Sequence, residues 1–230
     1  MQHLWSKDYF GIFNFRFYHL GEWSDVVIDD FLPTLEGKLI FSSSKDHNEF
    51  WPALLEKANA KYVGNYAKLS GGSPLTAALH FCEGFSNTYE TSEYQDKIQE
   101  LFEDMKAAKE KSSIVTCSTH YFRDRIGEES VKLGLRTNHA YVVTGLCQIE
   151  YESIGKIVQL IRIHNPWGCG EWMGAWSDYS DEMKSLTSIE KEQIDADIED
   201  DGEFYMDMND FVKVKKNCEV AQKYKIGTKQ

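Results

Sequence analysis

The sequence predicts an α+β fold, and three observations lead to that prediction. Two N-terminal segments alternate apolar and polar residues, as half-buried strands do. Two later segments, 48–69 and 92–111, repeat apolar residues at helical spacing. Two β-branched segments, 139–149 and 155–165, are separated by a turn-length stretch, which favours an antiparallel pair. Because strands and helices do not alternate regularly, a βαβ architecture is not expected.

The N-terminal third begins with an expected hairpin, which a helix follows. Residues 11–20, "GIFNFRFYHL", form the first strand, Gly21 turns the chain, and the second strand starts at Glu22. A third short strand is expected at 35–41, "LEGKLIF". In the helix after it, Pro52 falls in the first turn, where its missing N–H does no harm. The apolar stripe of that helix consists of Phe50, Leu54, Leu55, Ala58 and Tyr62.

The breaker cluster "SGGSP" at 70–74 marks a candidate boundary, because Gly and Pro interrupt regular structure. Residues 75–92 fit no single element. We expect two parts, one formed by residues 1–82 and the other by residues 83–225.

The second part contains one clear amphipathic helix, at 92–111, and a strand at 112–118 follows it. The apolar face of the helix consists of Ile98, Leu101, Phe102 and Met105. Residues 120–137 are polar and loop-like, and the two long strands come after them. Towards the C-terminus we expect a helix around 186–195, then an acidic turn, a short strand and a short helix within 198–214.

Composition narrows the classes of function. A chain of 230 residues with 42% hydrophobic content can form one compact core or two small lobes. A net charge of −12 disfavours nucleic acid and anionic membrane as partners. No apolar run is long enough for a transmembrane helix, and the N-terminus does not have the pattern of a signal peptide. Five cysteines without a CxxC motif favour a reducing, cytoplasmic setting.

A histidine and an asparagine stand at adjacent strand ends. His139 opens the first long strand and Asn165 closes the second. In an antiparallel pair these two ends are neighbours, so the Asn oxygen would fix the imidazole while its other nitrogen exchanges a proton with a nucleophile. Trp167 would cover that contact. The alternative is that His139 is a partly exposed polar residue without a catalytic role; His164 points to the opposite face by strand alternation.

Several segments, in this order, resemble the protease core of the calpains, a family of calcium-dependent, papain-like cysteine proteases. They are "GEWSDVVIDDFLPT", "NEFWPALLEKANAKYVGNYAKLSGG", "NHAYVVTG", "LIRIHNPWG", "EWMGAWSD" and "DDGEFYM", and the match runs from about residue 9 to about residue 218. The resemblance implies a papain-like fold with an incomplete N-terminal lobe and an antiparallel-sheet C-terminal lobe. It assigns His139 as the catalytic base, Asn165 as the residue that orients it and Trp167 as the shield.

The sequence departs from the calpain pattern at three points. Asn138 stands where the family usually has Gly, a change that we expect to be tolerated, and "HFCEGFS" stands where the family has "DFTGG". The third departure is the nucleophile, a Cys in a "GDCW" motif at a helix N-terminus, which would precede Met1. The cysteines present are Cys82, Cys117, Cys147, Cys169 and Cys218. None stands where attack would need it, so we expect no peptide cleavage by this chain alone.

Acidic residues in two loops are candidate calcium ligands. Spacing alone favours solvated acidic loops over a calcium site, and no EF-hand pattern is present. The resemblance implies a Ca²⁺ site in the C-terminal lobe that would remain here, formed by Glu171, Asp178, Asp201 and Glu203 with a backbone carbonyl near Glu199. It also implies a second site in the N-terminal lobe that uses Glu49, and we expect that site to be broken because its other ligands lie upstream.

Two functions follow from the sequence. The first is a portion, or a truncated product, of a calcium-dependent intracellular cysteine endopeptidase that performs limited proteolysis through a Cys-His-Asn triad, here without its Cys. The alternative is a non-catalytic, calcium-binding regulator that binds polypeptides. In both cases the partners are protein substrates or polypeptide ligands, and further upstream and downstream domains are expected. We also expect the N-terminal hairpin to expose apolar surface.

Overall fold

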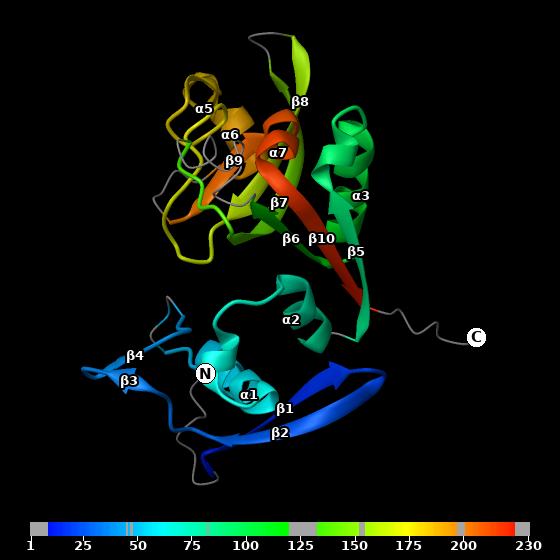
Figure 1. Ribbon diagram of the computed structural model, residues 1–230. Coiled ribbons are helices and arrows are strands. Elements are labelled where there is room, and N and C mark those ends of the chain that lie inside the picture. The colour runs from blue at the N-terminus through cyan, green and yellow to red at the C-terminus, as the bar shows by residue number, and fades with distance from the viewer. Residues whose placement is uncertain are drawn as a thin grey trace. The chain divides into compact units, whose positions relative to one another are not determined.

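The computed structural model describes residues 9–44, 46, 48–81, 83–119, 133–151, 155–196 and 201–223 (Figure 1). The chain divides into two compact units, Met1–Glu83 and Gly84–Gln230, here called unit 1 and unit 2. The division falls next to the boundary expected after residue 82. That these units are the two lobes of a protease core stays a prediction. Within the described residues, no helix is both long and apolar enough to cross a membrane.

Unit 1 is a hairpin covered by helices. Its elements are β1 (Ile12–His19), β2 (Glu22–Asp29), β3 (Thr34–Leu35), β4 (Lys38–Leu39), α1 (Trp51–Val63), the 3₁₀ helix η1 (Tyr66–Leu69) and α2 (Pro74–Phe81). The hairpin β1–β2 is confirmed, and Phe15 pairs with Val26 in its register. Phe17 is fully buried, and its ring stacks on Tyr62 of α1 with the ring centroids 5.0 Å apart.

Two expectations for unit 1 were wrong in detail. The helix expected to reach residue 69 ends at Val63, because Gly64 has φ = 121° and breaks the helical path. Asn65 then begins η1, and its side chain accepts a hydrogen bond from the N–H of Lys68. The single strand expected at 35–41 is instead the short β3–β4 hairpin. Glu36 and Gly37 both have positive φ there, as a tight two-residue turn requires.

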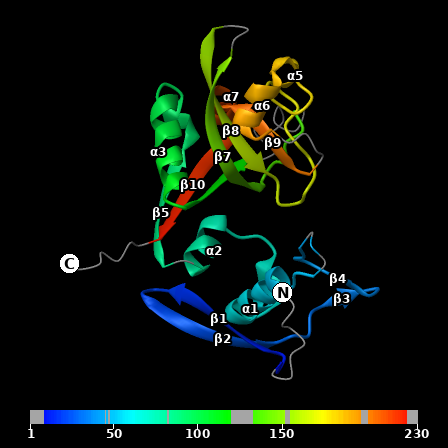
Figure 2. The ribbon, with the colours of Figure 1, turned by 180° about the vertical axis from the view of Figure 1, so that it is seen from behind.

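Unit 2 is built on one antiparallel sheet. Its elements are β5 (Gly84–Glu90), η2 (Thr91–Tyr94), α3 (Ile98–Glu110), β6 (Ile114–Thr119), β7 (Ala140–Tyr151), β8 (Lys156–His164), α5 (Asp181–Ser185), α6 (Ser188–Ile194), β9 (Glu203–Asp207), α7 (Met208–Val214) and β10 (Lys215–Lys223). The strand order is β5-β10-β6-β7-β8-β9, so the last strand in sequence lies inside the sheet (Figure 2). The predicted α+β class with a large antiparallel sheet is confirmed.

Both faces of this sheet are covered. Successive side chains of β8 point to opposite faces of the sheet. Ile161 and Ile163 pack with α3 and α7 on one face, and Leu160 packs with α5 and α6 on the other. Figure 1 shows α3 on one side of the sheet and α5 and α6 on the other. The apolar face predicted for the helix at 92–111 is confirmed, because Leu101 and Phe102 are fully buried, although α3 itself begins only at Ile98.

The pair β7–β8 contains an irregularity near the start of β7 and the end of β8. Val143 pairs with Ile163, but Gly145 pairs with Arg162, so Thr144 is an extra residue on β7. Such a β-bulge twists and bends the strand that carries it. The bulge therefore decides how the first residues of β7 meet the last residues of β8.

Candidate active site

His139 and Asn165 meet where β7 begins and β8 ends. His139 directly precedes β7, and Asn165 directly follows β8. Because Val142 pairs with His164, these two strand ends lie side by side. The Nε2 atom of His139 is 2.8 Å from Oδ1 of Asn165, within hydrogen-bond distance. The neighbourhood that the strand pattern led us to expect is therefore present.

The surroundings of Asn165 determine which way its amide points. Nδ2 donates to the carbonyls of Cys169 (2.6 Å) and Gly170 (3.1 Å), and Oδ1 accepts from the N–H of Trp167 (3.1 Å). The hydrogen-bond network thus assigns Oδ1 as the acceptor that faces His139. His139 must then donate from Nε2, which leaves Nδ1 as the basic nitrogen of the neutral ring. Asn165 is fully buried, so this arrangement is fixed by its environment.

The backbone before β7 is held by the end of β6. The hydroxyl of Thr119 donates to the carbonyl of Arg136 at 2.6 Å and accepts from the N–H of His139 at 3.2 Å. Asn138, between them, has φ = 52°. Asparagine is one of the few residues besides glycine that adopt this left-handed conformation readily. This explains physically how Asn138 can occupy a position where the resemblance leads one to expect glycine.

Aromatic rings flank the imidazole. The ring of Trp167 lies with its centroid 4.4 Å from that of His139, and the ring of Tyr141 meets it edge-on at 4.9 Å. The guanidinium of Arg136 lies 5.7 Å from the Trp167 centroid, within cation–π distance. Trp167 itself is 62% exposed, so it covers the histidine as an outer layer rather than as part of the core. His164 is half-buried within β8 and takes no part in the pair.

Sequence reasoning did not identify Thr119, Arg136 and Tyr141 as parts of this site. A signal existed for Tyr141, because it follows His139 by two residues in a strand and so shares its face. No signal existed for Thr119, since its role depends on the pairing of β6 with β7, which joins residues distant in sequence.

Three of the four described cysteines do not offer an activated thiol. Burial raises the pKa of Cys117 and of Cys147 to about 11 each, and it raises the pKa of Cys218 as well. Thiols with such pKa values stay protonated at neutral pH and are poor nucleophiles. Cys169 is exposed in the loop after Asn165. Cys82 lies outside the described residues.

Two of the candidate calcium ligands accept hydrogen bonds from backbone N–H groups. Glu171 accepts from the N–H of Gly202 at 2.9 Å, and Asp201 accepts from the N–H of Glu203 at 2.9 Å. The carboxylate of Glu203 lies 3.7 Å from Nε of Arg162. Asp178 is buried, with 4% of its surface exposed.

The remaining predicted ligands lie elsewhere. In unit 1, Glu49 accepts from the hydroxyl of Ser44 at 2.9 Å, and Glu199 lies outside the described residues. In the parts of the chain that the structure describes, no three His, Cys, Asp or Glu side chains are grouped so as to hold a metal ion. As arranged, the described carboxylates link two loops without forming a coordination sphere.

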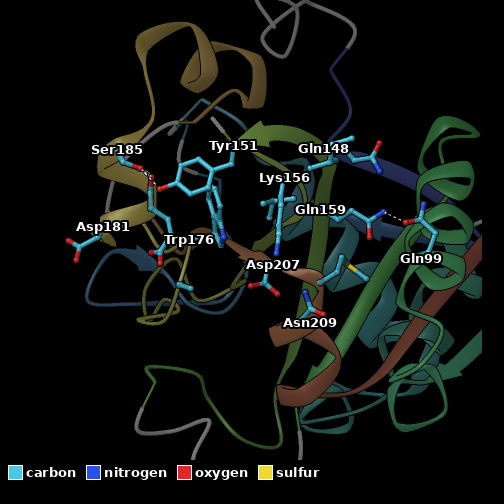
Figure 3. Close-up of a pocket in the computed structure, with 15 residues that line it drawn as sticks. Gln99, Gln148, Tyr151, Lys156, Gln159, Trp176, Asp181, Ser185, Asp207 and Asn209 are labelled. Atoms are coloured by element: carbon cyan, nitrogen blue, oxygen red, sulfur yellow. Dashed lines mark hydrogen bonds between the residues drawn. The ribbon is translucent and has the colours of Figure 1, made fainter. Parts of the chain in front are cut away.

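A large hollow lies at the other end of the β7–β8 pair from His139. It has a volume of about 1050 Å³ and includes neither His139 nor Asn165. Figure 3 shows Tyr151, Trp176 and Ser185 on one side of it and Gln99 with Gln159 on the other. A second hollow, of about 550 Å³, lies in unit 1 and is lined mainly by aromatic side chains and leucines. The chemistry of the His139 site is therefore not located in either hollow.

Comparison with known proteins identifies the family. The sequence model of the calpain family cysteine proteases matches residues 1–222. The chain is 43% identical to mouse (Mus musculus) calpain-9 over 206 residues, which cover 90% of this chain and 29% of the relative. It is 42% identical to the human (Homo sapiens) calpain-1 catalytic subunit over 208 residues, covering 90% of this chain and 28% of that protein. The chain therefore spans less than a third of the length of these relatives.

The described architecture agrees with this match. Helices packed on a large antiparallel sheet are what an α+β, papain-like protease core contains. The paired His139 and Asn165 lie within the matched residues. The chain belongs to the calpain family of cysteine proteases.

Proposed function

We propose that this chain supplies the histidine and asparagine half of a Cys-His-Asn site in a calcium-dependent, calpain-type endopeptidase that performs limited proteolysis. The observation that carries the proposal is the 2.8 Å contact between His139 Nε2 and Asn165 Oδ1, with the amide orientation set by three further hydrogen bonds. The protein substrates and the intracellular setting belong to the same proposal. The four described cysteines are free thiols, which suits a reducing compartment.

The arrangement supports a definite division of labour. With Nε2 donating to Asn165, Nδ1 of His139 is the atom that would take the proton of an approaching thiol. The same nitrogen would return a proton to the leaving amine when the peptide bond breaks. Asn165 would hold the ring in one tautomer and orientation through both steps.

We propose further that the nucleophilic thiol is not one of the cysteines of this chain. The raised pKa values of Cys117, Cys147 and Cys218 support that view. We expect the purified chain to leave an unfolded protein substrate intact during prolonged incubation. Cleavage that a single Cys→Ala change abolishes would contradict the proposal. The control is a longer chain, in which an upstream segment containing a Gly-Asp-Cys-Trp motif is attached to this one. Any cleavage by the longer chain should be lost in its His139→Ala variant.

The alternative function is a polypeptide-binding, non-catalytic relative. The raised pKa values of the buried thiols support this alternative as well as the protease function, because in both cases the chain lacks a nucleophile of its own. The two functions are separated by the attached-segment experiment. Cleavage by the longer chain that depends on His139 supports the protease function. A longer chain that is folded but inactive supports the polypeptide-binding function.

Calcium binding by the loops around Glu171 and Asp201 is part of the proposal. The support is the hydrogen bond from Gly202 to Glu171, which holds the two acidic loops together. The carboxylates would have to exchange their backbone N–H partners for the ion, since Ca²⁺ takes six to eight oxygen ligands. Titration calorimetry with CaCl₂ should give binding that Asp201→Asn removes and that the control Asp210→Asn, on α7, retains. No heat with the unaltered chain would refute this part.

A further inference from the structure

Lys215, the first residue of β10, is fully buried. Burial of a lysine is rare and costly unless its charge finds a partner. Among the described residues its Nζ has no hydrogen-bond partner. What it contacts instead is aromatic: Nζ lies 3.7 Å from the ring centroid of Tyr141 and 5.9 Å from that of Phe204. A desolvated ammonium against a ring face is the strong form of the cation–π interaction.

Tyr141 connects this lysine to the candidate active site. The ring of Tyr141 is fully buried and meets the ring of His139 edge-on, at 4.9 Å and 79°. Its hydroxyl accepts a hydrogen bond from the N–H of Arg136 at 2.8 Å, which ties down the segment that leads to His139. The position of this one ring therefore affects both the imidazole and the backbone before it.

A second connection runs through the backbone. In the register of β10 and β6, Lys215 pairs with Thr119. The hydroxyl of Thr119 holds the carbonyl of Arg136 and the N–H of His139. Lys215 thus stands beside the anchor of the histidine as well as beneath its aromatic neighbour.

We propose that Lys215 is a positioning residue for His139, and that its ammonium acts by holding the Tyr141 ring against the imidazole. The proposal rests on the proposed function only for the catalytic meaning of His139. The positioning itself is a property of the folded chain and is tested without any turnover.

The charge state of Lys215 makes the proposal measurable. Burial lowers the pKa of Lys215 to about 8, so its ammonium is lost at mildly alkaline pH, and only the ammonium makes a cation–π contact. The titratable groups that face it are Tyr141 on β7 and Cys117 on β6. Burial raises their pKa values to about 12 and about 11. On β10 itself, Cys218 has a raised pKa and Glu219 lies beside Thr116.

The test is a pH titration of the full chain by NMR, with labelled lysine, tyrosine and histidine side chains. In the unaltered protein, the ring signals of Tyr141 and His139 should both show a step with a midpoint near pH 8, together with the side chain of Lys215. In Lys215→Met the step should vanish from both rings. In the matched control Lys213→Met, an exposed lysine on α7, the step should stay.

Two results would overturn the proposal. One is a step near pH 8 in the Tyr141 and His139 signals that persists in Lys215→Met. The other is a Lys215 that titrates in the folded, unaltered chain while both rings show no response, an outcome that needs no variant to fold. Because neither result depends on proteolysis, a failure here is distinguishable from a failure of the proposed function.

Discussion

At the scale of single residues, Asn165 determines the chemistry of the site. Its amide satisfies two carbonyls and one N–H of its own loop before it reaches His139. That loop therefore selects the tautomer of the histidine, and an Asn side chain suits the position because it both donates and accepts. A carboxylate could not donate to the two carbonyls.

Asn165→Ala should loosen both the loop and the imidazole. Because the change leaves buried polar groups without partners, the free energy of unfolding should fall by about 2–4 kcal/mol. Urea unfolding measures that loss, and ¹⁵N NMR of the imidazole should show a mixture of tautomers. Asn209→Ala, an exposed position on α7, serves as the control and should change neither quantity. A single Nε2-protonated tautomer in Asn165→Ala would argue against our assignment.

Lys215 should make stability depend on pH. Its pKa of about 8 in the folded chain lies below the 10.5 of an exposed lysine. Between these values the unfolded chain binds more protons, so stability should rise as pH increases above 8. The buried thiols oppose this rise above about pH 9, because their raised pKa values penalise the folded state there.

Urea unfolding between pH 7 and pH 9 should therefore show an increase in the free energy of unfolding. The increase should be absent in Lys215→Met, which should also be the more stable protein at pH 7. Equal slopes in the two proteins would mean that Lys215 does not titrate in this range.

At the scale of elements, strands were easier to predict than the ends of helices. Alternating or β-branched segments predicted β1, β2, β7 and β8, because a strand with one buried face repeats apolar residues at every second position. Two helix ends were missed. α1 ends before Gly64, whose positive φ overrides an apolar stripe that continues, and α3 begins only at Ile98, after the 3₁₀ helix η2. The helix expected around 186–195 is present as α6, whereas α5, which ends at Ser185 just before it, was not predicted.

The break before α6 has a local cause that can be tested. Thr187 and Glu190 form a capping box, in which each side chain bonds the backbone N–H of the other. Thr187→Ala should lower the free energy of unfolding by about 1 kcal/mol, the usual value of an N-cap. Ser188→Ala, one residue further on, should cost less, and thermal unfolding of the two variants makes the comparison. An equal loss in both would show that the box does not stabilise α6.

At the scale of the whole molecule, the sequence predicted the pairing at the site better than its surroundings. His139 and Asn165 are each adjacent to a regular strand, so a local rule was enough to bring them together. The contact of Thr119 with His139 depends on the pairing of β6 with β7. The contact of Lys215 with Tyr141 depends on β10 lying inside the sheet between β5 and β6. No local pattern encodes that order. The carboxylate cluster expected from the acidic loops depends likewise on loop conformations that spacing does not specify.

Unit 1 should make the chain prone to association. Its described residues expose large apolar side chains, as expected for the hairpin region; they are Phe10, Ile12, Phe31, Leu35, Phe41 and Trp51. Exposed patches of this kind favour contacts between molecules. Sedimentation velocity should show association that increases with protein concentration and decreases in Phe31→Ser. Ile157→Ser in unit 2, also exposed, is the control and should associate like the unaltered chain. A monomer at all concentrations would contradict this prediction.

The β-bulge at Thr144 makes the site sensitive to the length of the chain. Deletion of Thr144, the extra residue, would bring Val143 and Gly145 together in the ladder with β8. It would thereby remove the added bend and twist that set how His139 meets Asn165. Relatives that retain the site should therefore differ here by exchange of residues and not by insertion or deletion. Gaps within β7 or β8 then become a simple sequence criterion for family members that have lost the pair.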